Sequence, residues 1–219
     1  LHDALPISWY ERSLAIGAKT ARDFDALESP RVFKTHLLPR WLPRVGRRVY
    51  LVRDGADVLA SYHAFYRSHL GYRGTFEEFF ERFLAGRLQY GAWADHVTSW
   101  LALEHRPDVL IVAYEDLSGA FDETVRRLAR FLELPLDDEL MARVRERCSL
   151  EWMKRHETRF DHITSLLKER GLEPGSFVRR GRVGEGGALL DDEQRRALER
   201  ARRRRGPVLP ERRLADFLR

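Results

Sequence analysis

The chain has 219 residues, 43% of them hydrophobic and 33% charged, and its net charge of +5 favours an anionic ligand without requiring a nucleic acid. This length suits one domain with a sizeable core, and the composition argues against a disordered tail and against a membrane span, which needs roughly 18 consecutive apolar residues. The single cysteine excludes a disulfide framework and a multi-cysteine zinc site, and it indicates a reducing, cytoplasmic compartment.

The first seven residues differ in character from the rest of the chain. Residues 1–7 read LHDALPI, with no initiator Met, and back-translate to the end of a common sequencing adapter. We therefore leave them out of the fold prediction, as one would a fusion scar. The interpretation that follows is a coding sequence truncated upstream, with residues 9–219 forming a single domain.

Three short runs have the composition of β-strands. They lie at residues 31–36, 48–52 and 108–114. The second and third are nearly continuous in apolar residues, which is typical of strands covered on both faces.

Helical patterns follow the strands. Thr75 and Glu78 form a capping box ahead of an apolar face of phenylalanines. Residues 121–132 repeat the helical period, and a last helix is expected over 191–204, after a loop-like stretch at 160–187. Strands that alternate with helices predict an α/β fold, with parallel strands joined by right-handed crossovers.

The first candidate site is the strand at residues 31–36. Alternation along it places Lys34 and His36 on one face, about 7 Å apart. An ammonium and an imidazole suit a reaction that builds negative charge while a proton leaves. For an isolated Lys-x-His, a strand end that emerges into solvent is the commoner outcome.

The second candidate site follows the strand at residues 48–52. Ligands gather at the carboxyl ends of strands in open α/β sheets. Arg53 stands at such an end and presents a rigid fork to a phosphate, Asp54 is a plausible N-cap, and Ser61 could add a hydroxyl two turns later. The alternative for Arg53 is an exposed salt bridge.

The third candidate site is the segment FVRRGRVG at residues 177–184. Paired arginines beside glycines can surround an anion with side chains and backbone N–H groups together. The alternative is a solvated basic loop.

Together these segments resemble the cytosolic-type sulfotransferase family, which uses 3′-phosphoadenosine-5′-phosphosulfate (PAPS) as donor. Five matches occur in family order and at family-like spacing, and in order they are far more specific than any one alone. They are RVFKTHLLP at 31–39, VYLVRDGADVLASY at 49–62, YGAW at 90–93, YEDL at 114–117 and FVRRGRVG at 177–184. The resemblance implies a three-layer parallel sheet with helices on both faces, a P-loop nucleotide-kinase-like fold here lacking its first strand and phosphate loop.

The resemblance also implies roles for individual residues. His36 matches the general base, and Lys34 matches a lysine that stabilises the transferring group. The residues that match donor contacts are Arg53 and Ser61 at the 3′-phosphate, Tyr114, Cys148 and Leu150 at the adenine, and Phe177, Val178, Arg179, Arg180 and Gly181 in a closing loop. Phe65 and His96 fall near acceptor-binding positions.

The implied reaction is transfer of a sulfuryl group from PAPS to a hydroxyl or amine of a small-molecule acceptor. Positioning and cationic stabilisation carry such in-line transfers, and the scattered histidines predict no metal site. Loops at 68–74 and 160–176 are expected to line the acceptor pocket. The sequence predicts neither a nucleic-acid nor a membrane partner, and it leaves the oligomeric state open.

Three departures from the family pattern stand out. No segment matches the phosphate loop, so we expect the chain alone to be weakly active or inactive. Residues 185–187 read EGG where the family has an acidic residue, Trp and a basic residue, and the loss of that Trp leaves open how the closing loop packs. Cys148 and Leu150 stand where hydroxyl and aromatic side chains are common.

Two other classes of function stay open. One is a non-catalytic module that binds a 3′-phosphorylated nucleotide. The other is a basic nucleic-acid-binding domain, which ranks last because acidic residues are interspersed and no nucleic-acid motif occurs. A kinase of related fold is less favoured still, since no magnesium-binding pattern accompanies the sheet.

Overall fold

The computed structural model describes residues 7–15, 17, 19–157, 178 and 181–204. The chain divides into two compact units, Leu1–Pro43 and Arg44–Arg219, and each is described by itself. The single domain over residues 9–219 therefore stays a prediction. Within the described residues, the helices are all too short or too polar to cross a membrane.

The first unit contains a two-stranded parallel sheet. Strand β1 (Ser8–Trp9) pairs with β2 (Phe33–Lys34), so that Trp9 lies opposite Lys34. Helices α1 (Tyr10–Ala15) and α2 (Ala21–Asp25) and the 3-10 helix η1 (Pro39–Trp41) complete the described elements of this unit. Phe24 of α2 is buried, and its ring lies 5.2 Å from that of Phe33.

The strand expected at residues 31–36 is present but shorter than predicted. After Lys34, the backbone amide of His36 donates to the Glu11 carboxylate, and the amide of Leu37 donates to the Thr35 hydroxyl. Because these two backbone amides donate to side chains, they cannot also pair with a neighbouring strand. Regular pairing therefore ends at Lys34.

The second unit contains β3 (Arg48–Val52) and β4 (Val109–Ala113). They pair in parallel and in register from Arg48 opposite Val109 to Val52 opposite Ala113, which confirms the parallel strands predicted here. Strand β4 is mostly buried, as expected. The prediction that β3 is covered on both faces is wrong, because Val49 and Leu51 are 42% and 48% exposed.

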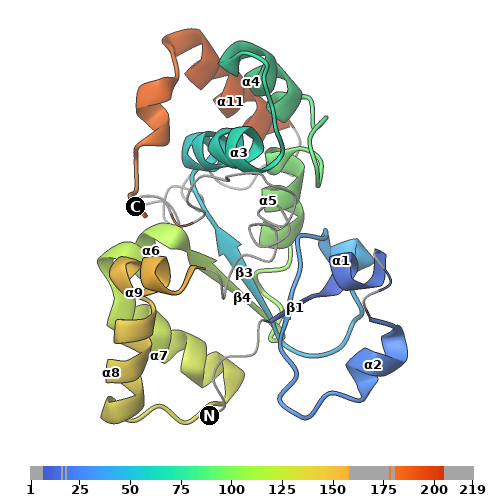
Figure 1. Ribbon diagram of the computed structural model, residues 1–219, viewed down its shortest axis with the longest axis vertical. Helices are drawn as coiled ribbons and strands as arrows, with labels where there is room; N and C mark the ends of the chain where they lie inside the picture. The colour runs from blue at the N-terminus through green and yellow to red at the C-terminus, as the bar shows by residue number, and fades with distance from the viewer. Residues whose placement is uncertain (1–6, 16, 18, 158–177, 179–180, 205–219) are drawn as a thin grey trace. The chain divides into compact units, whose positions relative to one another are not determined.

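Two groups of helices flank β3 and β4 (Figure 1). On one side are α3 (Gly55–His69), α4 (Phe76–Leu84), α5 (Trp93–Leu101) and α11 (Asp192–Arg204). Beside β4 are α6 (Tyr114–Gly119), α7 (Phe121–Leu132), α8 (Asp138–Arg147) and α9 (Leu150–Arg155). Tyr50 of β3 stacks on Trp100 of α5 with centroids 5.1 Å apart, and Arg127 of α7 donates to the Ile111 carbonyl of β4. This arrangement confirms the α/β class and the helices expected at 121–132 and near 191–204.

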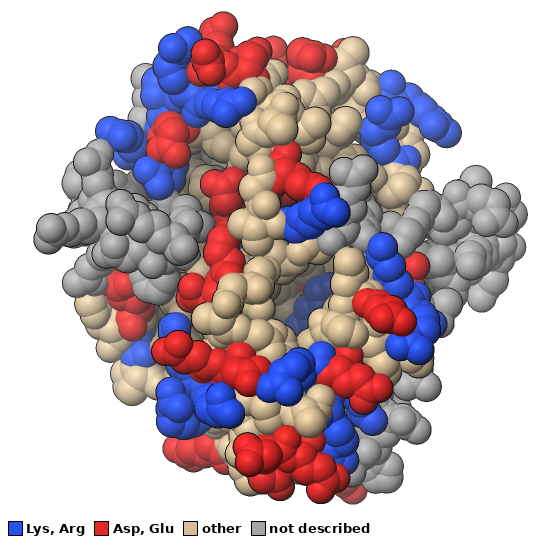
Figure 2. Space-filling view, turned by 90° about the vertical axis from the view of Figure 1, so that its left-hand side faces the viewer, with Lys and Arg blue, Asp and Glu red and all other residues tan. Residues whose placement is uncertain are grey.

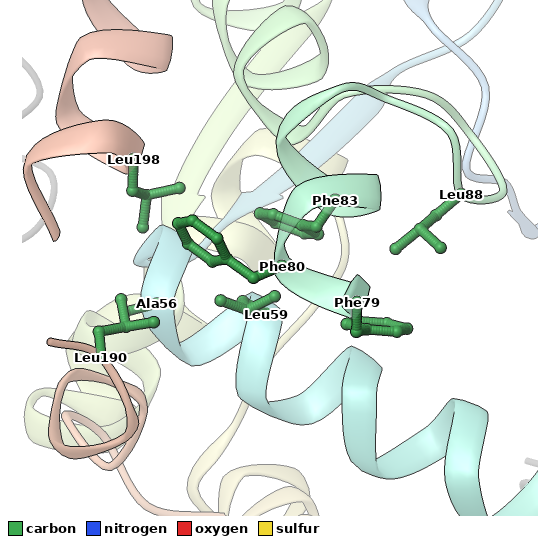
Figure 3. Packing of buried hydrophobic residues seen from close by; sticks show 8 residues of the cluster. All are labelled: Ala56, Leu59, Phe79, Phe80, Phe83, Leu88, Leu190 and Leu198. Atoms are coloured by element: carbon green, nitrogen blue, oxygen red, sulfur yellow. The ribbon is translucent and has the colours of Figure 1, made fainter. Parts of the chain in front are cut away.

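The core of the second unit forms where α3, α4 and α11 meet (Figure 3). The capping box is confirmed, since the Glu78 amide donates to Thr75 Oγ1 at 3.2 Å and the Thr75 amide donates to Glu78 Oε2 at 3.0 Å. From that start, helical periodicity turns the phenylalanines of α4 toward α3 and α11. The buried cluster consists of Ala56, Leu59, Phe79, Phe80, Phe83, Leu88, Leu190 and Leu198.

Candidate functional site

Strands β3 and β4 end side by side, because Val52 and Ala113 are register partners. The residues that follow them, Arg53 and Tyr114, are therefore neighbours. The Arg53 guanidinium lies over the Tyr114 ring, 4.2 Å from its centroid. A cation at this distance from an aromatic face is held by the ring quadrupole.

Arg53 is fixed by further contacts. Its Nη2 donates to the carbonyl of Arg182 at 3.0 Å and approaches Asp57 Oδ2 at 3.4 Å. Its side chain is 23% exposed, and its Nε is buried with no hydrogen-bond partner among the described residues. The alternative of an exposed salt bridge is wrong, since the Asp57 side chain is only 1% exposed.

The start of α3 is also tied down. Asp54 is the N-cap, as predicted, and its Oδ1 accepts from the amides of Ala56 at 2.9 Å and Asp57 at 3.1 Å. The Asp54 amide donates to Glu115 Oε1 at 3.2 Å, which links α3 to the residue after Tyr114. These bonds hold the two strand ends together.

Gly181 lies beside both Leu150 and Tyr114. Gly181 has a φ of +62°, and a Cβ added to it would lie 3.4 Å from Leu150 Cδ1 and 4.0 Å from the Tyr114 hydroxyl. The Tyr114 hydroxyl also donates to the Gly181 carbonyl over a long 3.5 Å. Arg53, Tyr114, Leu150 and Gly181, which we call the Arg53 cluster, are thus brought together from four segments of the chain.

The other predicted donor contacts lie outside this cluster or outside the described residues. Ser61 is exposed on α3, two turns beyond Arg53. Cys148 is the C-cap of α8, and partial burial raises the pKa of its thiol. The Val178 amide donates to Glu157 Oε1 at 2.6 Å. Phe177, Arg179 and Arg180 are not among the described residues.

Sequence analysis missed Asp57. Its Oδ2 accepts from the Gly184 amide at 2.9 Å and its Oδ1 from the Gly186 amide at 2.7 Å. The available signal was an acidic residue four positions after Arg53, set among the apolar residues of α3. Its partners are too far along the chain for that signal to identify them.

The structure shows how residues 185–187 pack in this chain, while a difference in packing from the family's loop stays a prediction. Gly186 is buried, and a Cβ there would lie 2.2 Å from the carbonyl carbon and oxygen of Ala56. A larger side chain cannot occupy this position while the loop stays on α3. Gly186 therefore permits the packing of the loop.

The two predicted acceptor residues lie on different helices of the second unit. His96 of α5 bonds through Nδ1 to the Tyr50 hydroxyl at 3.1 Å, and burial raises the pKa of Tyr50. Phe65 of α3 stacks on His69, with ring centroids 4.8 Å apart. Contact with an acceptor stays a prediction for both.

In the first unit, Lys34 and His36 both contact Trp9. Lys34 Nζ lies 4.7 Å from the centroid of its ring, and the His36 ring lies 4.8 Å from it. The two side chains predicted to share a face therefore lie against a common aromatic surface.

Glu11 is a second residue that sequence analysis missed. Its Oε1 accepts from the Trp9 indole at 2.7 Å and from the His36 amide at 2.8 Å, and it lies 3.7 Å from His36 Nδ1. Burial opposes ionisation of Glu11, but these hydrogen bonds hold its pKa below the ordinary value of 4.5. A carboxylate beside Nδ1 suits a histidine that takes up a proton at its other nitrogen.

A metal site was not predicted. Among the described residues, no group of three or more His, Cys, Asp or Glu side chains is arranged to hold a metal ion. A metal-free reaction stays a prediction.

Comparison with known proteins identifies the family. The profile of the sulfotransferase domain matches residues 3–209. The chain belongs to the sulfotransferase family. This confirms the resemblance carried by the five sequence segments, all of which lie inside the matched range.

Curated sulfotransferases support the same membership. Sulfotransferase 1B1 of Mus musculus is 35% identical over 165 residues, which cover 72% of this chain and 54% of that protein. Sulfotransferase 1E1 of Homo sapiens is 34% identical over 172 residues, covering 75% and 58%. This chain thus spans little more than half the length of these two relatives.

Solved structures agree with the fold. The crystal structure of mouse sulfotransferase SULT7A1 complexed with PAP superposes with a TM-score of 0.76 at 25% identity, covering 90% of this chain and 74% of that one. Retinol dehydratase in a complex with retinol and PAP gives a TM-score of 0.72 at 25% identity, covering 91% and 62%. The predicted P-loop nucleotide-kinase-like α/β class is confirmed for this chain.

Proposed function

We propose that this protein transfers a sulfuryl group from PAPS to a hydroxyl or amine of a small-molecule acceptor. The observation that carries the proposal is Arg53, held at the carboxyl end of β3 by the Tyr114 ring and the Arg182 carbonyl. The related SULT7A1, complexed with PAP, supports the donor class. Retinol dehydratase, solved with retinol and PAP, supports a small apolar alcohol as acceptor.

The Arg53 cluster fits a phosphorylated nucleotide. An arginine offers several N–H donors, and the buried Nε of Arg53 has no protein partner among the described residues. We assign Arg53 and Ser61 to the donor's 3′-phosphate, together with the loop from Phe177 to Gly181. We assign Tyr114, Cys148 and Leu150 to the adenine. When bound, PAPS supplies the activated sulfuryl group.

The two residues to which we assign catalytic roles, His36 and Lys34, lie in the first unit. His36 acts as general base and takes the acceptor proton at Nε2, because its Nδ1 is directed to the Glu11 carboxylate at 3.7 Å. Lys34 stabilises the negative charge that builds on the transferring group. Phe65 and His96 contact the acceptor. We place the protein in the cytoplasm, in keeping with its free cysteine.

Calorimetric titration tests the donor site without requiring turnover. The folded chain should bind adenosine 3′,5′-bisphosphate more tightly than adenosine 5′-monophosphate. Arg53→Ala should weaken bisphosphate binding by about 10-fold or more, because hydrogen bonds to charged groups are worth about 1.5–3 kcal/mol. The matched control is Arg143→Ala, an exposed arginine on α8. Equal affinity for the two nucleotides, or an unaffected Arg53→Ala, would contradict the assignment.

A transfer assay tests the base. In a chimera that joins the phosphate-loop segment of a related sulfotransferase to this chain, assayed with PAPS and a phenol, His36→Ala should lower the rate by about 100-fold or more while leaving bisphosphate affinity unchanged, since general base catalysis contributes about 10²–10⁴-fold. His105→Ala, whose side chain is 76% exposed, is the control. Full transfer by His36→Ala would show that another group takes the proton. We still expect the chain alone to transfer the sulfuryl group weakly or not at all, because no segment of it matches the phosphate loop.

A further inference from the structure

The carboxylate of Asp57 is buried at the first turn of α3. Its side chain is 1% exposed, and burying a carboxylate is costly unless its oxygens receive hydrogen bonds. Oδ1 accepts from the Gly186 amide at 2.7 Å, and Oδ2 accepts from the Gly184 amide at 2.9 Å. Arg53 Nη2 approaches Oδ2 at 3.4 Å. One side chain therefore joins the arginine of the proposed donor site to a loop more than 120 residues later in the chain.

That loop, residues 181–187, which we call the glycine loop, lies in backbone contact with α3. A Cβ at Gly186 would come within 2.2 Å of Ala56 and 2.4 Å of the Asp57 nitrogen, so only glycine allows this approach. Gly184 has a φ of +84°, a region that other residues rarely adopt. A Cβ at Gly187, by contrast, would meet nothing within 4 Å.

The glycine loop also supplies a contact to Arg53. The Arg182 carbonyl accepts from Arg53 Nη2 at 3.0 Å, two residues before the amide that Asp57 holds. Release of the loop from Asp57 would therefore remove the Arg182 carbonyl from the contacts that orient the guanidinium, leaving Asp57 and the Tyr114 ring.

We propose that Asp57 is a positioning residue that locks the glycine loop onto α3 and thereby aims Arg53 at the 3′-phosphate of the donor. The inference rests on the proposed function for the role of Arg53. The lock itself is a property of the chain without ligand, and it is tested separately.

The first test is Asp57→Asn. The Asn side chain is nearly the same size as the Asp side chain, but its NH₂ group would face one of the two backbone N–H donors of the loop. One hydrogen bond between residue 57 and the loop is therefore lost. Hydrogen exchange of the Gly184 and Gly186 amides should accelerate by about 10-fold or more, while exchange within α4 and α7 stays unchanged. Adenosine 3′,5′-bisphosphate should bind about 10-fold more weakly, with adenosine 5′-monophosphate unaffected. Asp138→Asn, an exposed aspartate on α8, is the control.

The second test leaves Asp57 in place. Gly186→Ala should displace the loop and reproduce both effects of Asp57→Asn, whereas Gly187→Ala should match the wild type, because a Cβ at Gly187 has open space. Circular dichroism and thermal melting of each variant establish that it is folded. If Asp57→Asn does not fold, the amide exchange and the bisphosphate affinity of folded Gly186→Ala still test the inference.

The outcomes separate the inference from the proposed function. Unchanged exchange at Gly184 and Gly186 in folded Asp57→Asn would overturn the lock. Accelerated exchange with unaltered bisphosphate affinity would overturn its role in aiming Arg53. If the wild-type chain does not prefer the bisphosphate, the proposed function fails, and the exchange rates still decide whether Asp57 holds the loop.

Discussion

Asp57 and Glu11 are two carboxylates that each accept hydrogen bonds from more than one donor. Asp57 accepts from two loop amides and approaches Arg53. Glu11 accepts from the Trp9 indole and the His36 amide. In both cases one buried or half-buried side chain satisfies several donors at once, which restricts the positions of the residues that donate. Each carboxylate thus positions a residue to which we assign a role in the reaction.

His63 provides a residue-scale prediction on stability. It lies on α3 beside Phe76 and Phe79, with ring centroids 5.2 and 5.0 Å away. Burial, and then the charge of Arg67, lower the pKa of His63 below its ordinary value of 6.5, although Glu77 opposes this. The unfolded chain therefore binds the proton more readily. The contribution to stability is complete above about pH 6.5 and is lost as the pH falls through the folded pKa.

The measurement is the melting temperature at pH 8 and at pH 5. We expect the wild type to lose more stability between these values than His63→Gln, which cannot titrate there. His105→Gln, whose side chain is 76% exposed, should keep the wild-type difference. The same pH dependence in His63→Gln and the wild type would show that His63 makes no such contribution.

At the scale of elements, α4 shows how a local pattern becomes a buried face. Its capping box starts the helix, and its phenylalanines then recur on one side. Phe79 is fully buried, and its ring lies 5.3 Å from the rings of both Tyr66 and Tyr72. The helix is held by this face, since an isolated helix of its length is marginal in water.

Phe79→Ala tests the contribution of that face. Removing a buried phenyl ring should lower the free energy of unfolding by about 3–5 kcal/mol, through lost burial and the cavity left behind. Chemical denaturation measures the change. Glu81→Ala on the exposed side of α4 should change it by no more than about 0.5 kcal/mol. A small effect at Phe79 would mean that the cluster repacks around the missing ring.

At the scale of the whole molecule, the sequence carries 39 Lys and Arg residues against 34 Asp and Glu residues. On the face shown in Figure 2, Lys and Arg side chains alternate with Asp and Glu side chains. Ion pairs such as Arg145–Asp122, between α8 and α7, join opposite charges at the surface. A basic nucleic-acid surface needs cations gathered in a patch or stripe, so this face lends no support to that alternative.

The sequence alone was sufficient for the features that depend on near neighbours. The helix at 121–132, the capping box at Thr75 and the N-cap at Asp54 each rest on residues within four positions of one another. The strand at 48–52 was also correct in extent, and the order of five short motifs identified the family. The placement of Arg53 at a strand end followed from the same local pattern.

Tertiary structure decided the features that join distant segments. The early end of β2 depends on Glu11, 25 residues before His36, and the exposure of Val49 and Leu51 depends on which helices lie near β3. The need for glycine at 186 and the role of Asp57 depend on a loop packed against α3. Periodicity describes which way a side chain faces along its own element. The partner that meets it is chosen only when the chain folds, because hydrogen bonds and packing act over a few ångströms of space, whatever the separation in sequence.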